Sequence, residues 1–174
     1  TLWDIATCKS ISHFKVDSGW SYCFDVVPDL NRLVTWPHSG GLLALWNTEE
    51  NTIIRKFPGH NNWVWSTTFS LNGKMILTAG EHVRLWDIQT GLEIKRYTDQ
   101  GVWITSCTFS PDNQWVAAGC DDHSIKIWNT ETGDFVKELS GHENGVNAIS
   151  ISQDGQKMLS GSDDSTARLW DINT

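Results

Sequence analysis

The chain has 174 residues, a hydrophobic fraction of 39% and a formal net charge of −8, which suits one domain or part of a larger one. So acidic a chain is not expected to bind nucleic acid or an anionic membrane, because both require clustered Lys and Arg. No apolar run approaches the ~18 residues of a membrane span, and the four cysteines form no Cys-x-x-Cys pair that would indicate a zinc or redox site.

Taken in chain order, the predicted elements are short strands separated by turns. The end of a strand at "TLWD" is followed by one further strand over residues 7–15. The segments after it repeat a pattern of four strands, and the pattern is clearest between residues 103 and 139. There the strands are expected at 103–109, 114–120, 125–128 and 134–139. No stretch has a sustained helical period, so short antiparallel strands are expected throughout.

The ending Trp-Asp or Trp-Asn marks the repeat. It recurs at intervals of 40 to 43 residues, at Trp3, Trp46, Trp86, Trp128 and Trp170. A fixed period of this length, with four short strands in each unit, is typical of β-propellers.

Further markers stand in register with these endings. They are the Gly-His pairs at His60 and His142 and the Phe-Ser turns at Ser70 and Ser110. On these motifs the chain resembles the WD-repeat β-propeller family over essentially its whole length. The resemblance implies an all-β fold, with β-propeller blades of four antiparallel strands and four blades' worth of chain.

The resemblance also divides the chain, because the first strand of a repeat in this family belongs to the previous blade as its outer strand. Residues 1–174 then form one WD-repeat β-propeller portion. It consists of an outer strand at 7–15, whole blades at about 20–57, 63–97 and 103–139, and a fourth blade at 146–170 that lacks its outer strand.

Four blades leave uncovered sheet faces at both ends, and three arrangements stay open. The chain is a portion of a larger propeller, or two copies join head to tail into eight blades, or one chain closes as a ring of four. The start without Met and the termini inside a repeat favour a portion of a larger propeller, truncated or completed by another copy.

The last unit contains His142, Ser160 and Asp164, residue types that also form hydrolase triads. No nucleophile elbow or obvious oxyanion loop accompanies them. The resemblance implies instead a hydrogen-bonded network inside one blade, in which His142 bridges the acid and the hydroxyl and the indole of Trp170 finds an acceptor. We interpret these residues as structural and predict no catalytic residue.

The other units carry only parts of the same network, and the first has just a hydroxyl and its Trp. The second has His60, Thr78 and Trp86, but its turn before the Trp is two residues shorter and has no Asp in register. The third has Asp122 and Trp128 but no hydroxyl on its second strand. Because members are missing from copy to copy, we interpret the network as a stability device. The other histidines lack ligand-like spacing, so we predict no metal site and no cofactor.

Eleven tryptophans are far more than ordinary usage. Trp20, Trp63 and Trp103 occupy the same place in successive units, at the start of the first strand, which in the family that the chain resembles opens on the top face of the propeller. Two interpretations stay open: each Trp covers its own blade, or the three form an aromatic patch for a partner.

Acidic residues would flank this patch on the same face. They lie in the turns between the second and third strands, at Glu81, Asp121 and Asp163. An acidic rim around aromatic side chains favours basic or apolar peptide segments as partners.

The resemblance implies a non-enzymatic protein–protein interaction scaffold that binds partners through the top face. The alternatives are a regulatory or sensor segment of a larger multidomain protein and, with less support, a propeller hydrolase or lyase. We expect proteins or peptides as partners, with head-to-tail self-association as a further option, and neither nucleic acid nor membrane. The cysteines in strand-like runs suggest reduced thiols and a cytoplasmic or nuclear location.

Overall fold

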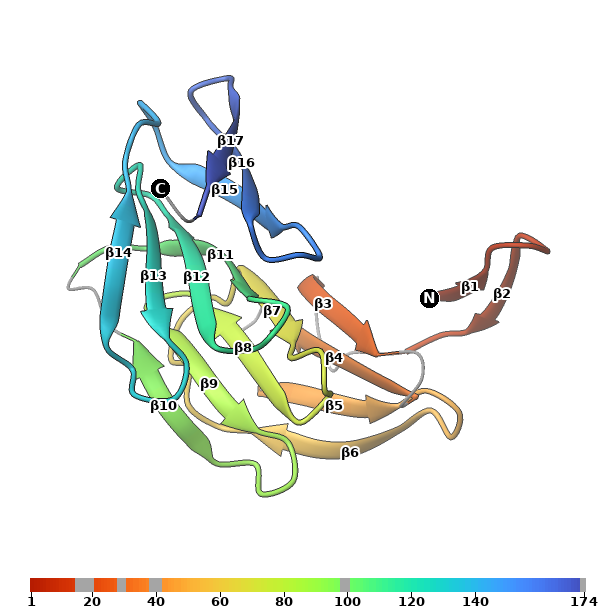
Figure 1. The fold of residues 1–174 in the computed structure, drawn as a ribbon. Coiled ribbons are helices and arrows are strands. Elements are labelled where there is room, and N and C mark those ends of the chain that lie inside the picture. Colours follow the sequence, from red (N-terminus) through yellow and green to blue (C-terminus); the bar gives the residue numbers. More distant parts are fainter. Residues whose placement is uncertain (15–20, 28–30, 38–41, 98–100, 173–174) are drawn as a thin grey trace.

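A computed structural model describes residues 1–14, 21–27, 31–37, 42–97 and 101–172. Their regular structure consists of strands β1 to β17 (Figure 1). Within these ranges there is no helix long and apolar enough to cross a membrane. The all-β fold expected from the sequence is confirmed, as is its organisation in sheets of four antiparallel strands.

Three sheets of the described part have four strands each, and we refer to them as blades one, two and three. Blade one contains β3 (Ser21–Val27), β4 (Arg32–Pro37), β5 (Leu43–Asn47) and β6 (Thr52–Phe57). Blade two contains β7 (Ser66–Phe69), β8 (Met75–Ala79), β9 (Val83–Asp87) and β10 (Glu93–Tyr97). Blade three contains β11 (Ile104–Phe109), β12 (Trp115–Cys120), β13 (Ile125–Asn129) and β14 (Phe135–Leu139).

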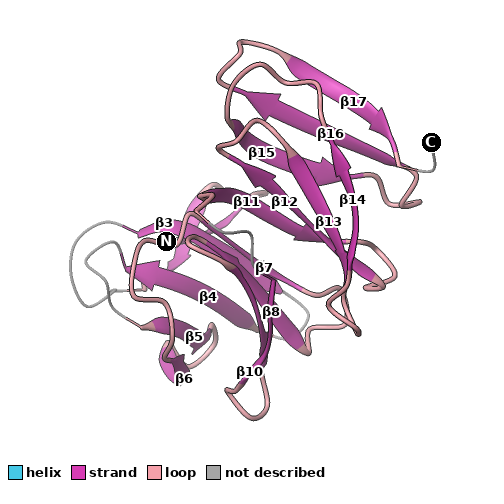
Figure 2. Cartoon of the chain, turned by 90° about the vertical axis from the view of Figure 1, so that its left-hand side faces the viewer, coloured by secondary structure: helices cyan, strands magenta, loops and turns pink. Residues whose placement is uncertain are grey.

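Two smaller sheets lie at the ends of the chain. Blade four has three strands, β15 (Val146–Ile151), β16 (Lys157–Ser162) and β17 (Ala167–Asp171). The N-terminal hairpin has two, β1 (Leu2–Asp4) and β2 (Lys9–Ser12). The blades follow one another as an open fan in Figures 1 and 2, with the first strands of neighbouring blades in contact along its inner side.

The core lies between the blades. Strands point successive side chains to opposite faces, so a blade with neighbours on both sides buries both faces. Between blades one and two, Leu45 and Phe57 pack against Phe69 and Trp86. Two further apolar clusters fill the spaces between blades two and three and between blades three and four. This packing is why "ILTA" and "WVAAGC" are apolar almost without interruption.

Short polar motifs make the turns between the first and second strands. In "SLNG" the hydroxyl of Ser70 donates to Oδ1 of Asn72 at 2.8 Å and accepts the N–H of Met75 at 2.9 Å. The same bonds recur in "SPDN" and "SQDG". The fourth residue of each motif is Gly or Asn with a positive φ, 63° at Gly73 and 58° at Asn113, which these two residue types adopt readily.

A cation on the outer strand links each blade to the next. Arg55 donates to the carbonyl oxygens of Gln89 and Thr90 in blade two, at 3.0 and 3.2 Å. At the equivalent positions, Lys95 donates to the carbonyl of Glu131 and Lys137 to that of Ile172. These contacts tie the outer edge of one blade to the turn after the third strand of its neighbour.

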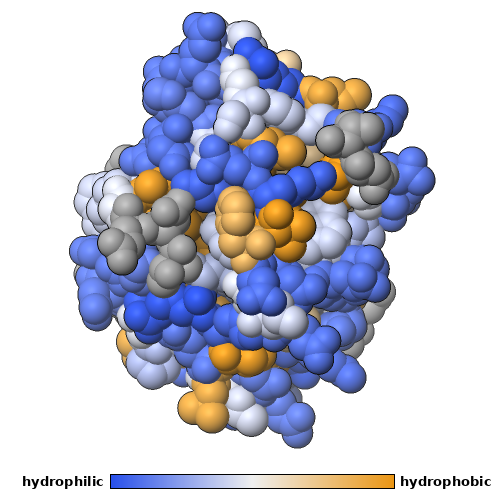
Figure 3. All heavy atoms as spheres, turned by 60° about the vertical axis from the view of Figure 1, so that its left-hand side comes forward, coloured by the Kyte–Doolittle hydropathy of each residue, from blue (hydrophilic) through white to orange (hydrophobic). Residues whose placement is uncertain are grey.

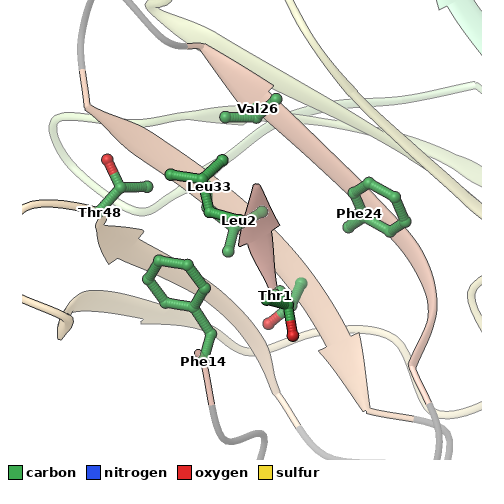
Figure 4. A pocket seen from close by; sticks show the side chains of 8 residues that line it. Thr1, Leu2, Phe14, Phe24, Val26, Leu33 and Thr48 are labelled. Carbon is green, nitrogen blue, oxygen red and sulfur yellow. The ribbon is translucent and has the colours of Figure 1, made fainter. Parts of the chain in front are cut away.

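The N-terminal hairpin covers only part of blade one. The ring of Phe14 meets that of Trp46 edge-on, with centroids 6.0 Å apart. Beside them lies a pocket of about 250 Å³, whose lining includes Leu2, Phe24 and Leu33 (Figure 4). The side chain of Phe24 is 70% exposed, so this face of blade one is partly uncovered.

Blade four is open on the face turned away from blade three. Leu159 and Leu169 are 51% and 66% exposed there, and a methyl group built on Gly161 would meet nothing within 4 Å. At the position equivalent to Gly161, blade three has Gly119, whose added methyl group would lie 2.9 Å from Val146. Blade four therefore covers blade three, and no described residue covers blade four in the same way.

The outer strands carry exposed apolar side chains as well. Ile94 on β10 and Phe135 and Val136 on β14 are each about half exposed. Figure 3 views the molecule from the side on which these strands lie in Figure 1, and hydrophobic residues form small groups there among hydrophilic ones. Scattered apolar residues of this kind are ordinary on protein surfaces.

Candidate functional site

Blade four brings its four predicted network residues together. His142 precedes β15, Ser160 lies on β16, Asp164 lies in the turn to β17, and Trp170 lies on β17. Nδ1 of His142 lies 2.6 Å from a carboxylate oxygen of Asp164, and Nε2 lies 2.7 Å from the hydroxyl of Ser160. The indole N–H of Trp170 donates to the same hydroxyl at 2.8 Å.

Burial decides what this arrangement can do chemically. The spacing matches a hydrolase triad, but Ser160 is 1% exposed and its oxygen already accepts the indole N–H of Trp170. The oxygen has no open side from which to attack a substrate. The network instead ties the entry to β15, strand β16, the following turn and strand β17 into one unit.

Asp164 carries the charge of this network. Burial would raise the pKa of its carboxyl group, but hydrogen bonds from the Thr166 hydroxyl, the His142 ring and two backbone N–H groups outweigh that effect and hold the pKa well below its usual value. The bonds from Thr166 measure 2.6 Å from the hydroxyl and 2.8 Å from the N–H. The residue is therefore a carboxylate near neutral pH, aimed at the buried imidazole.

Blade two keeps half of this network. Nε2 of His60 lies 2.7 Å from the Thr78 hydroxyl, which also accepts the indole N–H of Trp86 at 2.9 Å. Nδ1 of His60 is buried and has no hydrogen-bond partner among the described residues. Burial and the nearby charge of Arg84 lower the pKa of His60 to about 3, so its imidazole is neutral.

A different ion network occupies this end of blade two. Arg84, 3% exposed, pairs with Glu81 at 2.9 Å and with Glu93 at 3.0 Å. Glu81 also accepts a hydrogen bond from the Asn62 amide at 3.0 Å. Sequence reasoning placed Glu81 on the surface and did not find this network. The sequence indicated only that Arg84 and Glu93 lie on neighbouring strands of one blade, and the strand register that brings them together comes from the structure.

Blade three departs further from the network. Asp122 accepts from the Ser124 hydroxyl at 2.6 Å and pairs with Lys126 at 2.6 Å, so no His is involved. Trp128 packs on Tyr97 of blade two, with ring centroids 5.8 Å apart. The structure therefore places Asp122 and Trp128 at the expected positions but does not join them in a blade-four type of network.

The top face is the end of the blades at which each first strand begins and each second strand ends. Trp63 and Trp103 lie there at equivalent positions and are 50% and 43% exposed. Trp65 joins them, 36% exposed, with its ring edge-on to that of Trp63 and 5.3 Å between centroids. Sequence reasoning overlooked Trp65, which lies two residues after Trp63 and directly before β7. Trp20 lies outside the described residues.

The two aromatic positions are held by the turns beside them. The N–H of Trp103 donates to Asp121 at 3.0 Å, and its carbonyl accepts the N–H of Asp121 at 3.0 Å. Between blades, the N–H of Ile104 donates to the carbonyl of Gly80 at 2.9 Å. Gly80 is also where an added methyl group would lie 2.4 Å from the carbonyl oxygen of Trp63. Trp63 and Trp103 therefore flank the same turn.

The three predicted acidic residues lie at the top face but differ in exposure and in their ion pairs. Asp121 and Asp163 are exposed, while Glu81 is held in the ion network of blade two. Asp163 accepts a hydrogen bond from the Asn147 amide. In blade four, Gly145 takes the place of the Trp, and a methyl group added there would lie 3.5 Å from Cα of Asp121 in blade three.

The described residues contain no group of three His, Cys, Asp or Glu side chains close enough to hold a metal ion. Cys23, Cys107 and Cys120 are buried free thiols, and Cys8 is an exposed one. Burial raises the pKa of Cys23 to about 12, so this thiol is not a reactive thiolate.

The third strand of each blade ends in Trp-Asp or Trp-Asn, and in blades one, two and four the indole donates to a buried hydroxyl. Repeated antiparallel blades of this kind define a repeat protein of the β-propeller class. The family model "WD domain, G-beta repeat" matches residues 51–87, 92–129 and 133–171, more than half of the chain. The chain therefore belongs to the WD40 repeat family. Repeats of this family indicate a protein-interaction scaffold and are typically non-enzymatic.

One curated relative is similar over a shorter stretch. Transducin beta-like protein 3 of Bos taurus is 26% identical over 80 residues, which make up 45% of this chain. The match spans 10% of the length of that relative. The similarity therefore concerns about two blades' worth of chain.

Proposed function

We propose that the chain is a non-enzymatic interaction scaffold that binds a protein partner through its top face. The exposed cluster of Trp63, Trp65 and Trp103 carries this proposal. Trp residues are enriched among the positions that dominate binding energy at interfaces. Each of the three is more than a third exposed on the described chain, although Trp is usually well buried.

The partner segment would be basic or apolar. Asp121 and Asp163 are exposed on the same face, and carboxylates beside indole rings attract Lys and Arg side chains, both by charge and through the faces of the rings. At this face an acidic or nucleic-acid segment would meet the carboxylates of Asp121 and Asp163 and would be repelled.

The test compares proteins captured from a lysate by the wild-type chain, by Trp63→Ala and by Trp103→Ala. A partner whose capture falls in both variants is then purified, and its affinity is measured. We expect a loss of about tenfold or more. Leu71→Ala is the matched control, because Leu71 is 77% exposed at the opposite end of the blades. Unchanged affinity together with a large drop in melting temperature would mean that the tryptophans only cover their blades.

Self-association is a second candidate function, favoured by the two uncovered faces. Leu159 and Leu169 of blade four have the position of side chains that are buried between blades elsewhere, and Phe24 is exposed at the other end. A second copy seated head to tail would cover both. The mass of the chain in solution tests this proposal. A folded monomer at all concentrations would rule out self-association, and Leu169→Glu should dissociate a dimer.

Location and context follow from the same proposal. Buried free thiols suit a reducing compartment, and we propose the cytoplasm or nucleus. A regulatory or sensor segment of a larger protein would use the same surfaces, and an activity assay of the longer protein would distinguish the two roles. Expression of the chain with a fluorescent tag tests the location.

A further inference from the structure

A second surface lies away from the top face, in the groove between blades one and two. It has a volume of about 460 Å³ and carries three cations, Arg32, Arg55 and Lys74, against one carboxylate, Asp87. The carboxylate of Asp87 accepts hydrogen bonds from the N–H and the hydroxyl of Thr90, at 2.6 and 2.7 Å. A groove with excess positive charge is unexpected on a chain of net charge −8.

The next groove along the fan shows what the fold itself requires. It lies between blades two and three, has a volume of about 530 Å³ and is lined by residues at equivalent positions. There Met75 takes the place of Arg32, since each pairs with the last residue of the neighbouring third strand. Gln114 takes the place of Lys74. The packing of one blade on the next therefore does not require these two cations.

Only one of the three cations has a repeated structural role. Arg55 holds the next blade through two carbonyl oxygens, as Lys95 does in blade two. Among the described residues, Arg32 donates one hydrogen bond, at 3.2 Å, to the carbonyl of Gly73. Lys74 is exposed, and no hydrogen bond or ion pair of its side chain occurs among the residues that the structure describes. Its charge is available to a ligand.

Apolar residues complete the groove. Leu45 and Ile88 are almost fully buried in its floor, and Ile54 stands half exposed at its edge on β6. A ligand that fits carries negative charges for Arg32 and Lys74 and an apolar side chain for Ile54. We propose that this groove binds an acidic peptide segment that contains an apolar residue, on a partner or a part of a partner different from the one at the top face.

Nucleic acid and anionic membranes fit this groove less well. Both present extended phosphate arrays, which require many cations and would meet the remaining acidic surface. A short peptide places its carboxylates only where the groove is positive. It also uses Ile54, which a phosphate chain would leave exposed to water.

The experiment measures binding of a fluorescein-labelled peptide, rich in Glu with one central Leu, by fluorescence anisotropy. The test variant is Arg32→Met with Lys74→Gln, which copies the groove between blades two and three. The control variant is Lys9→Gln with Lys157→Gln, two exposed lysines elsewhere whose removal changes the net charge equally. We expect binding to be about tenfold weaker in the test variant, unchanged in the control, and weakened by added salt.

Several outcomes would overturn the proposal. They are no binding by the wild-type chain, equal binding by both double variants, or equally tight binding of single-stranded DNA or phosphatidylserine vesicles that depends on Arg32 and Lys74. The melting temperature of the test variant verifies that it is folded. Trp63→Ala should leave this binding unchanged, so the top-face proposal and the groove proposal can fail independently.

Discussion

Blades two and four contain the same three-residue arrangement, but the charge near the His ring is positive in blade two and negative in blade four. In both, a buried hydroxyl joins a His ring to the indole of the blade Trp. In blade four the second ring nitrogen faces a carboxylate, whereas in blade two it faces no partner among the described residues and lies near Arg84. The hydroxyl that bridges the His ring and the indole is therefore common to both blades. The carboxylate of Asp164 is present only in blade four, and blade two has the ion network of Arg84 at this end.

The blades also differ in how many of their faces are packed against a neighbouring blade. Blade two has neighbours on both faces, whereas blade four is open on one. Equivalent residues consequently differ in burial: Leu85 of blade two is 2% exposed and Leu169 of blade four is 66% exposed. Substitutions at equivalent positions can separate the effect of nearby charges on stability from the effect of burial between blades.

The largest effect is expected for the blade Trp. Trp86→Ala should lower the free energy of unfolding by about 3–5 kcal/mol, because Trp86 is 1% exposed and its loss leaves a large cavity. Trp170→Ala should cost less, since blade four is open on one side. Urea denaturation followed by fluorescence measures both. Equal losses would show that cover does not control the contribution of this residue.

The Leu pair tests cover without any polar partner. We expect Leu85→Ala to cost about 2–5 kcal/mol, and Leu169→Ala to change stability by less than about 0.5 kcal/mol, as at other exposed positions. The same denaturation assay applies, at low protein concentration. A large loss for Leu169→Ala would mean that its face is covered in solution, and solution mass would then report the covering copy.

The hydroxyl bridge can be removed from either blade. Thr78→Val keeps the shape of the side chain but leaves His60 Nε2 and the Trp86 indole without their shared partner, and should cost about 1–3 kcal/mol. Ser160→Ala should cost a similar amount in blade four. A neutral result in both blades would contradict the role of the hydroxyl as the common unit.

A further prediction concerns His60 and the change of stability with pH. Its folded-state pKa is lowered to about 3 from 6.5, so the unfolded chain binds a proton more readily between these values. Stability from this group is present above pH 6.5 and falls by about 1.4 kcal/mol per pH unit below it. His60→Gln should flatten this slope in denaturation curves measured from pH 7 to pH 5.

Asp164 should not contribute to that slope. Its pKa is lowered, so the stability it provides is present above the ordinary Asp value of 3.8 and is lost only as the pH falls below it. Asp154→Asn is a better control than Asp164→Asn between pH 7 and pH 5, because the pKa of Asp154 is also lowered but its carboxylate bonds to Ser152 and Gln156 and to no histidine. If Asp154→Asn flattened the curve as His60→Gln does, the assignment of the slope to His60 would be wrong.

Much of the fold could be predicted because the repeat is local. The strand period, the polar turn motifs and the Trp endings all act within one blade, and the resemblance to WD repeats implied the network of His142, Ser160 and Asp164 in blade four. The ion network around Arg84 was not predicted, because it uses side chains whose neighbours depend on the strand register. Trp65 was missed for a simpler reason, since only one Trp in each unit was compared.

The sequence by itself determined which strands form and in what order, since turn residues and alternating side chains encode them locally. Through its resemblance to WD repeats it also indicated the network of blade four. Only the tertiary structure decided which apolar faces are covered, which tryptophans stay exposed and which cations share a groove. Arg32 and Lys74 lie more than forty residues apart in the chain, and only the packing of one blade against the next places both charges in the same groove.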